Sequence, residues 1–382
     1  MREGWTYKKL VDECAILYGY PFDSKNFSSS NEDMPLVRIR DVKEGATSTY
    51  YKGVYPKEYV IHKGDYLIGM DGEFNISPWQ SDDALLNQRV CKIASKSSDM
   101  LMRYVYRFLV KELKKIEDET PFVTVKHLSA KKLNQIKLPV PPLSEQQRIV
   151  SELDLLSGII EKKKAQLKEY DQLAQSIFYD MFGDPVTNEK GWDVKKLGEL
   201  ASVKTGPFGS MLHKEDYISN AIPLVNPIHM KDFHIIADMD FTISNEKAEE
   251  LEKYILQKDD VIFARRGDIG RCAVVTEKEN GFLCGTGSLF VRFVVKVAST
   301  YIMYVIRSSS FTNELVSNAK GATMLNLNSS IVEELNFPLP PLSLQQSFAE
   351  KIEAIEKQKE LIKQAIIETE TLFNSRMDYY FN

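Results

Sequence analysis

The sequence predicts an α+β fold made of two tandem β-rich modules, each followed by a long helix. Three observations predict it: the chain repeats itself, both copies end in a proline-rich motif followed by a heptad pattern, and short strand-like runs precede that motif. The two helices are expected to pair as an antiparallel coiled coil with pseudo-twofold symmetry. With 382 residues, the chain is long enough for two domains with separate cores.

The internal repeat extends over most of the chain. The spacing between matching segments increases through each module and is constant from the proline motif onward. Loops tolerate insertions and packed elements do not, so each copy combines a variable module with a rigid part of fixed length. The matching segments are 4–10 with 191–197, 34–37 with 222–225, 63–68 with 258–263, and 138–147 with 337–346.

A long helix is predicted after each proline motif, because proline cannot donate to a β-ladder and ends the preceding strand. Ser144 with Gln147, and Ser343 with Gln346, have the spacing of a capping box. Gly183, followed closely by a proline, is predicted to end the first helix. The apolar seam is predicted at Ile149, Leu153, Leu156, Ile160, Leu167, Tyr170, Ile177, Met181, Phe348, Ile352, Ile355, Ile362, Ile366, Phe373 and Tyr380.

Polar residues interrupt this seam at Lys163 in the first helix and at Lys359, Thr369 and Arg376 in the second. A helical hairpin packed on one domain would show similar stripes, but two equal helices that follow two copies of one module favour mutual pairing. Because each helix begins at the end of its own module, an antiparallel pair would hold the modules at opposite ends. A helix of nearly forty residues would be about 57 Å long, so the pair is expected to be a spacer.

The modules are predicted to be rich in β-strands, since short runs of β-branched and aromatic residues alternate with turn signals. The turn signals are Asp71-Gly72, Arg266-Gly267-Asp268 and Asn280-Gly281. A helix is expected near 99–116 and near 299–317. The predicted strands are 36–39, 66–70, 261–264, 273–275 and 288–293.

The composition, 43% hydrophobic and 27% charged, is typical of a folded soluble protein. We find no apolar run of membrane-spanning length and no signal peptide, so a cytoplasmic location without a membrane partner is expected. The four cysteines and five histidines have neither disulfide-framework nor metal-ligand spacing. The net charge of −5 argues mildly against nucleic-acid binding, because phosphate contacts usually require a basic surface.

A search for catalytic motifs identifies none. Asn226-Pro227-Ile228-His229 lacks the second proline and the aromatic residue of an adenine-methyltransferase loop and is interpreted as a turn. The glycines in 205–210 lack the lysine of a phosphate-binding loop. We therefore expect no catalytic residues, no metal and no cofactor.

Side chains suited to DNA are arginine for guanine edges, amides for adenine and lysine for phosphate. The same residue types are also typical of a solvated surface. The Arg265-Arg266 pair before a glycine turn is the strongest candidate. The full set of candidates is Arg38, Arg40, Lys43, Asn75, Gln88, Arg89, Asn226, Lys231, Arg265, Arg266 and Arg271.

In its two proline motifs and the long helices predicted after them, the chain resembles the specificity subunits of type I restriction–modification systems. Both proline motifs resemble the motif that opens the long helices of that family, and 181–200 resembles its passage from the first helix into the second domain. Segments 64–74 and 87–90 resemble family strand–loop segments. The second module departs from them at 264–270, which suggests that the two modules read different sequences.

The resemblance implies a non-catalytic subunit that reads one half of a bipartite double-stranded DNA target with each target-recognition domain. Two methyltransferase subunits would dock on it, and restriction/translocase subunits would join them. The expected boundaries are 1–143 and 188–342 for the recognition domains, with 144–187 and 343–382 as spacer helices. The alternative is a non-catalytic coiled-coil adaptor that joins protein partners without reading DNA.

Overall fold

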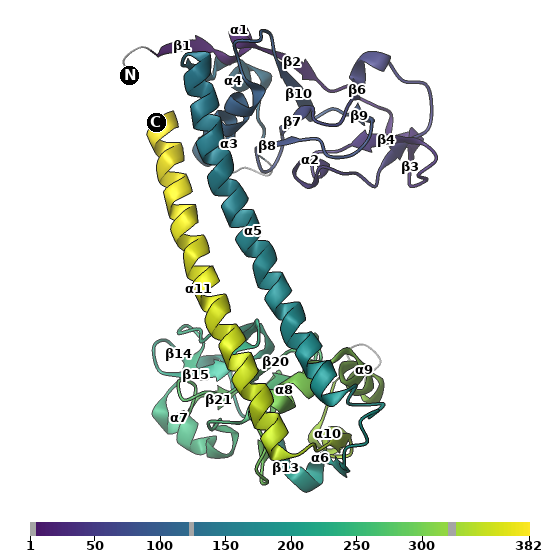
Figure 1. Cartoon of the computed structure of the whole chain (residues 1–382), viewed down its shortest axis with the longest axis vertical. Helices are drawn as coiled ribbons and strands as arrows, with labels where there is room; N and C mark the ends of the chain where they lie inside the picture. Colours follow the sequence, from purple (N-terminus) through teal and green to yellow (C-terminus); the bar gives the residue numbers. More distant parts are fainter. Residues whose placement is uncertain (1–4, 122–125, 320–325) are drawn as a thin grey trace. The chain divides into compact units, whose positions relative to one another are not determined.

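The computed structural model describes residues 5–121, 126–319 and 326–382. Gly4, the first residue of the repeated N-terminal motif, lies outside the described residues. Sheets and helices follow one another in a similar order twice along the chain (Figure 1). No helix within the described ranges combines the length and the apolarity that a membrane span requires.

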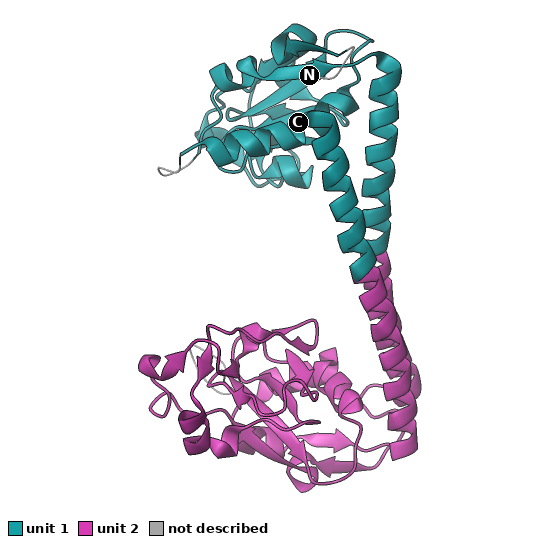
Figure 2. Ribbon diagram, turned by 90° about the vertical axis from the view of Figure 1, so that its left-hand side faces the viewer, with its two compact units in different colours: residues 1–164, 364–382 teal, residues 165–363 magenta. Residues whose placement is uncertain are grey.

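The chain divides into two units, and each contains one half of each long helix (Figure 2). The long helices are α5 (Leu143–Phe182) and α11 (Leu342–Phe381), both of 40 residues. The first unit comprises residues 1–164 and 364–382, and the second comprises 165–363.

The first module, residues 5–142 without 122–125, contains two sheets and a strand pair. The first sheet is antiparallel, in the order β2 (Cys14–Tyr18), β10 (Val90–Ser95), β7 (Tyr66–Gly69), β8 (Asn75–Pro78). The second is β3 (Phe27–Ser28), β5 (Tyr50–Tyr51), β4 (Met34–Val37), β9 (Ala84–Leu86), β6 (Val60–Ile61), with β4 and β9 parallel. Strand β1 (Thr6–Lys9) pairs with β11 (Lys137–Val140). The helices are α1 (Leu10–Glu13), η1 (Ser24–Asn26), α2 (Asp41–Glu44), η2 (Lys57–Tyr59), α3 (Met102–Glu119) and α4 (Ala130–Gln135).

The second module, residues 191–341 without 320–325, repeats this plan. Its antiparallel sheet is β13 (Ala201–Thr205), β22 (Ser288–Phe293), β19 (Val261–Ala264), β20 (Cys272–Val274). Its mixed sheet is β14 (Tyr217–Ile218), β18 (Thr242–Ile243), β15 (Ile222–Val225), β21 (Leu283–Cys284), with β15 and β21 parallel. The strand pairs are β12 (Val194–Lys196) with β23 (Asn336–Pro338), and β16 (Met230–Lys231) with β17 (His234–Ile235). The helices are α6 (Leu197–Leu200), η3 (Lys214–Asp216), η4 (Pro227–His229), α7 (Asn245–Glu250), η5 (Glu252–Tyr254), α8 (Ser299–Arg307), α9 (Ser309–Asn318) and α10 (Ser329–Glu333).

The turn signals in the sequence are confirmed. Gly72, Gly267 and Gly281 have φ angles of 71°, 75° and 95°, a region that glycine adopts without steric cost. Gly183 directly follows α5 with a φ of 72°, and its N–H donates to Tyr179 O over 2.9 Å, which confirms it as the residue that ends the helix.

The single helix predicted near 299–317 is wrong in one respect, because α8 and α9 meet at Ser308. The backbone of Ser308 is extended, with φ −61° and ψ 142°. Its Oγ donates to Val305 O over 2.7 Å and accepts from Phe311 N over 3.4 Å. The serine side chain therefore satisfies one backbone group of each helix end, which stabilises the break.

The predicted capping boxes are wrong, because α5 and α11 begin one residue before Ser144 and Ser343. Each serine therefore lies within the first turn rather than at the cap position. Glu145 N and Gln146 N donate instead to Pro142 O, over 2.9 Å and 3.0 Å. The last proline of the motif, Pro142, thus supplies the first acceptor of the helix.

Two buried glutamines of the repeated motif attach the long helices to their modules, a role that was missed in the sequence. Gln146 Oε1 accepts from Leu101 N over 2.9 Å, and Gln146 Nε2 donates to Asp99 O over 3.0 Å. Gln345 Oε1 likewise accepts from Ala298 N over 3.0 Å. Leu101 and Ala298 directly precede α3 and α8, so each amide joins the start of a long helix to the start of a helix of its own module.

Side chains of both long helices complete the core of each unit. In the first unit, Ile149 and Met377 belong to the same core cluster. In the second, Phe178 and Phe348 share a cluster, with ring centroids 5.8 Å apart. The two helices are antiparallel in both units, since the start of each packs beside the end of the other. All predicted seam residues are buried or half-buried.

Polar residues of the seam also pair across the helices. In the first unit, Arg376 forms an ion pair with Glu152, whose pKa falls below its ordinary value chiefly because of that hydrogen bond. In the second unit, Lys359 is only 5% exposed, and its Nζ lies 2.8 Å from both Asp171 Oδ1 and Glu356 Oε1. Two of the four polar interruptions in the heptad pattern, Lys359 and Arg376, are therefore buried or half-buried ion-pairing positions.

Glu356 links α11 to the β16–β17 hairpin of the second module. Its Oε2 lies 3.6 Å from His234 Nε2, and its Oε1 lies beside Lys359. Burial by itself would raise the pKa of Glu356, but the interactions with His234 and Lys359 outweigh it and lower the pKa to about 2. The ionised carboxylate is therefore part of the folded structure.

We expect this carboxylate to stabilise the fold above its unfolded pKa of 4.5 and to lose that contribution as the pH falls towards 2. Glu356→Gln should lower the free energy of unfolding by about 1–3 kcal/mol near pH 7, and the difference from wild type should shrink near pH 3. Urea unfolding at several pH values measures this. Glu360→Gln removes the exposed partner of Lys363 and should change stability by less than about 0.5 kcal/mol. A deficit for Glu356→Gln that does not vary with pH would contradict the prediction.

Candidate nucleic-acid interface

Three segments meet at one end of the first module's antiparallel sheet. Met70 N, just after β7, donates to Arg89 O over 2.9 Å, and Leu128 N donates to Met70 O over 2.7 Å. Asp71 and His127 form an isolated antiparallel bridge. These backbone contacts bring the side chains of Asp71, Arg89 and His127 together, although they are distant in sequence.

The three side chains form a cluster centred on the carboxylate. Arg89 Nε lies 3.4 Å from Asp71 Oδ2, and His127 Nδ1 contacts Asp71 Oδ1. Arg89 Nη1 lies 3.4 Å from His127 Nδ1. Arg89 also has a φ of 73°, an uncommon backbone conformation for a residue other than glycine and one that clusters at functional sites. With Arg89 and His127 exposed, the cluster presents donors and an acceptor to solvent.

Further candidates of the first module lie beside this cluster. Lys43 Nζ is 3.0 Å from Glu73 Oε1, and Asn75 Nδ2 donates to Glu73 O over 2.9 Å. Glu73 belongs to the same β7–β8 loop as Asp71, so the structure brings Lys43 and Asn75 to that loop. Gln88 is exposed and directly precedes Arg89.

Arg38 and Arg40 are both exposed and flank Ile39 between β4 and α2. A β-carbon placed on Gly69 would lie 3.2 Å from Ile39 Cγ1 and 3.3 Å from Asn75 Nδ2. This segment therefore approaches the base of the β7–β8 loop.

The two adjacent arginines of the second module have different environments. Arg265 is only 6% exposed, and its Nε donates to Asn326 Oδ1 over 3.0 Å and to Leu327 O over 3.2 Å. Burial, reinforced by the positive charge of Arg266, lowers the pKa of Arg265. Arg266 is exposed. The guanidinium of Arg265 thus supports the loop from inside, and that of Arg266 faces solvent.

Asn226 also takes part in the internal structure of its loop. Its Oδ1 accepts from Gly287 N over 3.1 Å, which ties the end of β15 to the segment before β22. The Asn226–His229 segment forms the short helix η4 after that strand, which confirms its interpretation as a turn.

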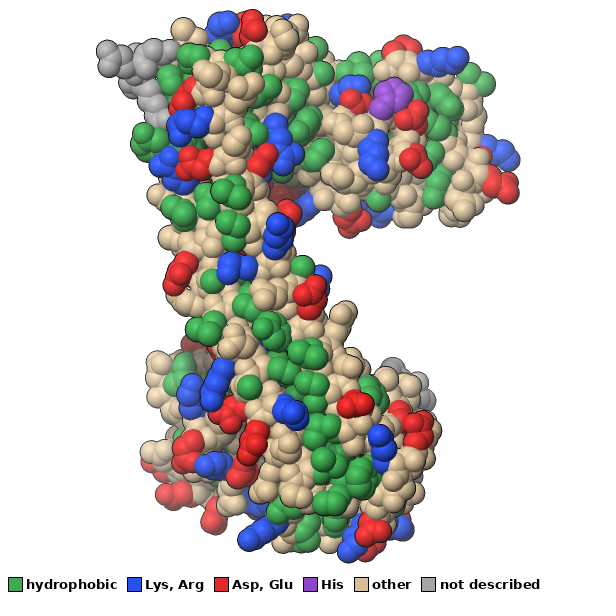
Figure 3. All heavy atoms as spheres, viewed as in Figure 1, with side chains coloured by type: hydrophobic (Ala, Val, Ile, Leu, Met, Phe, Trp, Pro, Cys, Tyr) green, Lys and Arg blue, Asp and Glu red, His purple; other side chains and the backbone are tan. Residues whose placement is uncertain are grey.

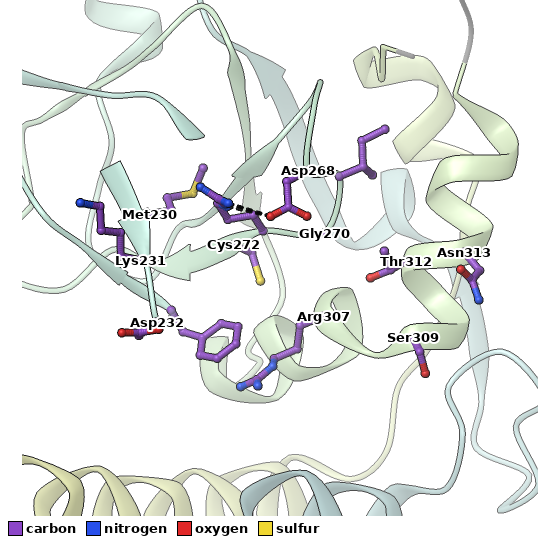
Figure 4. Close-up of a pocket in the computed structure, with 13 residues that line it drawn as sticks. Met230, Lys231, Asp232, Asp268, Gly270, Cys272, Arg307, Ser309, Thr312 and Asn313 are labelled. Carbon is purple, nitrogen blue, oxygen red and sulfur yellow. Dashed lines mark hydrogen bonds and ion pairs between the residues drawn. The ribbon is translucent and has the colours of Figure 1, made fainter. Parts of the chain in front are cut away.

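Lys231 and Arg271 line a cavity of about 720 Å³ within the second module (Figure 4). Arg271 Nε donates to Asp268 Oδ2 over 2.9 Å, and its Nη1 donates to Pro227 O over 3.3 Å. Arg307, labelled in the same view, has its Cζ 3.3 Å from the centre of the Phe233 ring. The cavity therefore lies between the β19–β20 loop, the β16–β17 hairpin and the junction of α8 with α9.

Asp71, His127, Asn326 and Arg307 are polar residues of these sites that sequence reasoning missed. One signal was available for two of them. His127 precedes the first proline motif by the same number of residues as Asn326 precedes the second. Equal spacing from a repeated motif predicts equivalent positions.

Within the described part of the chain, neither the cysteine thiols nor a group of metal-binding side chains forms a further chemical site. All four cysteines are buried and unbridged, and burial raises the pKa of Cys91 and of Cys272 to about 12, so their thiols stay protonated near neutral pH. Among the described residues, no group of three or more His, Cys, Asp or Glu side chains is placed to hold a metal ion.

Comparison with known proteins identifies one family. The family model described as "Type I restriction modification DNA specificity domain" matches the chain twice, over residues 2–169 and 189–371. The chain is 28% identical to the type I restriction enzyme EcoBI specificity subunit of Escherichia coli, over 93% of this chain and 80% of that protein. It is 22% identical to the MjaVIII specificity subunit of Methanocaldococcus jannaschii, over 87% and 83% of the two chains.

Two solved structures resemble the whole chain. One comes from work on complex assembly and conformational transition of the type I R-M system, with a TM-score of 0.63 and 17% identity over 100% of this chain and 98% of that one. The other is the type I restriction-modification system S subunit from M. genitalium, with a TM-score of 0.53 and 13% identity over 98% and 95%. These similarities confirm the predicted fold class of tandem β-rich modules with long helices.

The two adjacent arginines should respond differently to truncation. Arg265→Ala is expected to lower the free energy of unfolding by about 1–3 kcal/mol, because Asn326 Oδ1 and Leu327 O lose a buried donor. Arg266→Ala, which removes an exposed side chain, should change it by less than about 0.5 kcal/mol. Urea unfolding of the two variants beside the wild type measures both values. Equal losses would show that Arg266 also supports the fold.

Proposed function

Because the chain belongs to the family of type I restriction modification DNA specificity domains, we propose that it is the DNA-specificity subunit of a type I restriction–modification complex. In this role it reads a bipartite double-stranded DNA target, one half with each recognition domain, 1–143 and 188–342. The observation that carries the proposal is the double match of the family model. Each matched region contains a loop cluster with exposed arginine, and duplex readers use such side chains on base edges.

The long helices are proposed to set the gap between the two halves of the target. Each is a continuous helix of 40 residues, which corresponds to about 60 Å at a rise of about 1.5 Å per residue. The ion pairs of Arg376 with Glu152 and of Lys359 with Asp171 support a fixed register between them. A fixed register would keep the gap constant.

The subunit is proposed to act without catalysis of its own, in the cytoplasm, by directing two methyltransferase subunits and restriction subunits to the site. The long helices offer them a surface, because apolar side chains lie exposed along the helices (Figure 3). Leu155 is 65% exposed and Leu361 is 64% exposed. Apolar side chains exposed to this extent are favourable contacts for a partner protein.

Methylation mapping tests the proposal. The chain is co-expressed with a methyltransferase subunit of a type I system, in a host without DNA methylation, with a control that lacks this chain. A split motif with a fixed gap, present only with this chain, is the expected result. Methylation at a continuous site regardless of the chain would instead indicate an adaptor that joins proteins without reading DNA.

Exchange of one recognition domain should change one half of the target. Replacing residues 188–342 by the corresponding domain of another family member is expected to alter one half of the motif and to leave the other half and the gap unchanged, because each domain has its own reading loops. The same methylation mapping reports the result. A change in both halves would exclude independent reading by two domains.

A further inference from the structure

The two modules place equivalent backbone positions together but fill them with different side chains. In the second module, Arg265 N donates to Gly287 O over 3.1 Å, Leu327 N donates to Arg265 O over 2.8 Å, and Arg266 forms an isolated antiparallel bridge with Asn326. The same three contacts join the loops of the first module. The equivalent pairs are Met70 with Arg265, Asp71 with Arg266, Arg89 with Gly287, and His127 with Asn326.

The first set combines hydrogen-bond donors with an acceptor. Asp71 supplies carboxylate oxygens, held between Arg89 and His127, and both of these basic side chains are exposed. A carboxylate accepts from the exocyclic amino group of cytosine or adenine, and an arginine donates to guanine. The set is therefore suited to a base that presents an amino group.

The second set has no carboxylate and offers mainly donors. Arg266 occupies the position equivalent to the aspartate, and no ion pair or hydrogen bond of its side chain occurs within the described ranges. Asn326 Oδ1 accepts from Arg265 Nε over 3.0 Å, so the asparagine has its amide nitrogen left to donate. In the major groove guanine presents two acceptors, N7 and O6, and this matches a set that offers mainly donors.

We propose that these equivalent positions determine base specificity and that the two modules read different bases with them. Arg266 and Asn326 recognise a guanine in one half-site, with buried Arg265 as the residue that positions the Asn326 amide. Asp71, supported by Arg89 and His127, recognises the amino group of an adenine or cytosine in the other half-site. The inference rests on the proposed function and adds the side chains that distinguish the two half-sites.

The experiment is methylation mapping with single variants, after a melting curve shows that each variant is folded. Arg266→Ala should reduce the preference for one guanine about 10- to 100-fold and leave the other half and the gap unchanged. Arg266→Lys should not restore it, because lysine keeps the charge but lacks the planar fork that binds guanine at two points. Asp71→Ala should relax one adenine or cytosine in the opposite half, because it removes the carboxylate that accepts from the amino group of the base.

Lys278→Ala is the matched control, because it removes an exposed cation from a different turn of the second module and should leave the motif unchanged. A wild-type chain that yields no split motif would overturn the proposed function itself. A split wild-type motif that stays the same in Arg266→Ala would overturn only this inference. Full restoration of the guanine preference by Arg266→Lys would also overturn it, since it would show that the planar fork of arginine is not what recognises the base.

Discussion

Both recognition cores depend on the antiparallel pairing of α5 with α11. The first core contains Ile149 and Leu153 from the start of α5 together with Met377 and Tyr380 from the end of α11. The second core contains the end of α5 and the start of α11 in the same way. A parallel pair would remove Met377 and Tyr380 from the first core, and truncating large core side chains typically costs about 2–5 kcal/mol each. Folding of the modules and pairing of the helices are therefore coupled.

The register of that pairing is specified by charge as well as by apolar packing. An apolar seam tolerates a shift by one heptad, because every heptad presents similar side chains. Such a shift would separate Lys359 from Asp171 and leave a buried ammonium group without that partner. Arg376 and Glu152 impose the same condition in the other unit. These ion-pairing positions thus lower the number of alternative registers between α5 and α11. A specificity subunit needs one register if the gap between its half-sites is to be constant.

Features with a local or periodic signal could be predicted from the sequence, and features defined by a distant partner could not. The heptad runs predicted both long helices, and glycine turns such as Asp71-Gly72 predicted the loops. Gln146 belongs to the repeated proline motif, but its role as an anchor could not be predicted, because its partner Leu101 N is a backbone group 45 positions away. Arg265 and Arg266 are adjacent residues of the same type, so the sequence does not distinguish them. Only the fold, which brings Asn326 to Arg265, shows that Arg265 is the buried one. The DNA-reading residues predicted in both modules remain predictions. The structure shows which of their donor and acceptor groups are already used in contacts within the protein.

The pairing of cations with acids in these loops bears on how an acidic chain can read DNA. Arg89 contacts Asp71, Lys43 contacts Glu73, and Arg271 contacts Asp268. Acidic and basic side chains are also interspersed on the face drawn in Figure 3. Exposed pairs contribute only about 0–1 kcal/mol, so either partner of such a pair can exchange the other for a matching base edge at small cost. On non-specific DNA the same carboxylates repel phosphate, and that penalty is not offset by base contacts. A net charge of −5 therefore weakens non-specific binding more than specific binding, which favours discrimination between sequences over affinity.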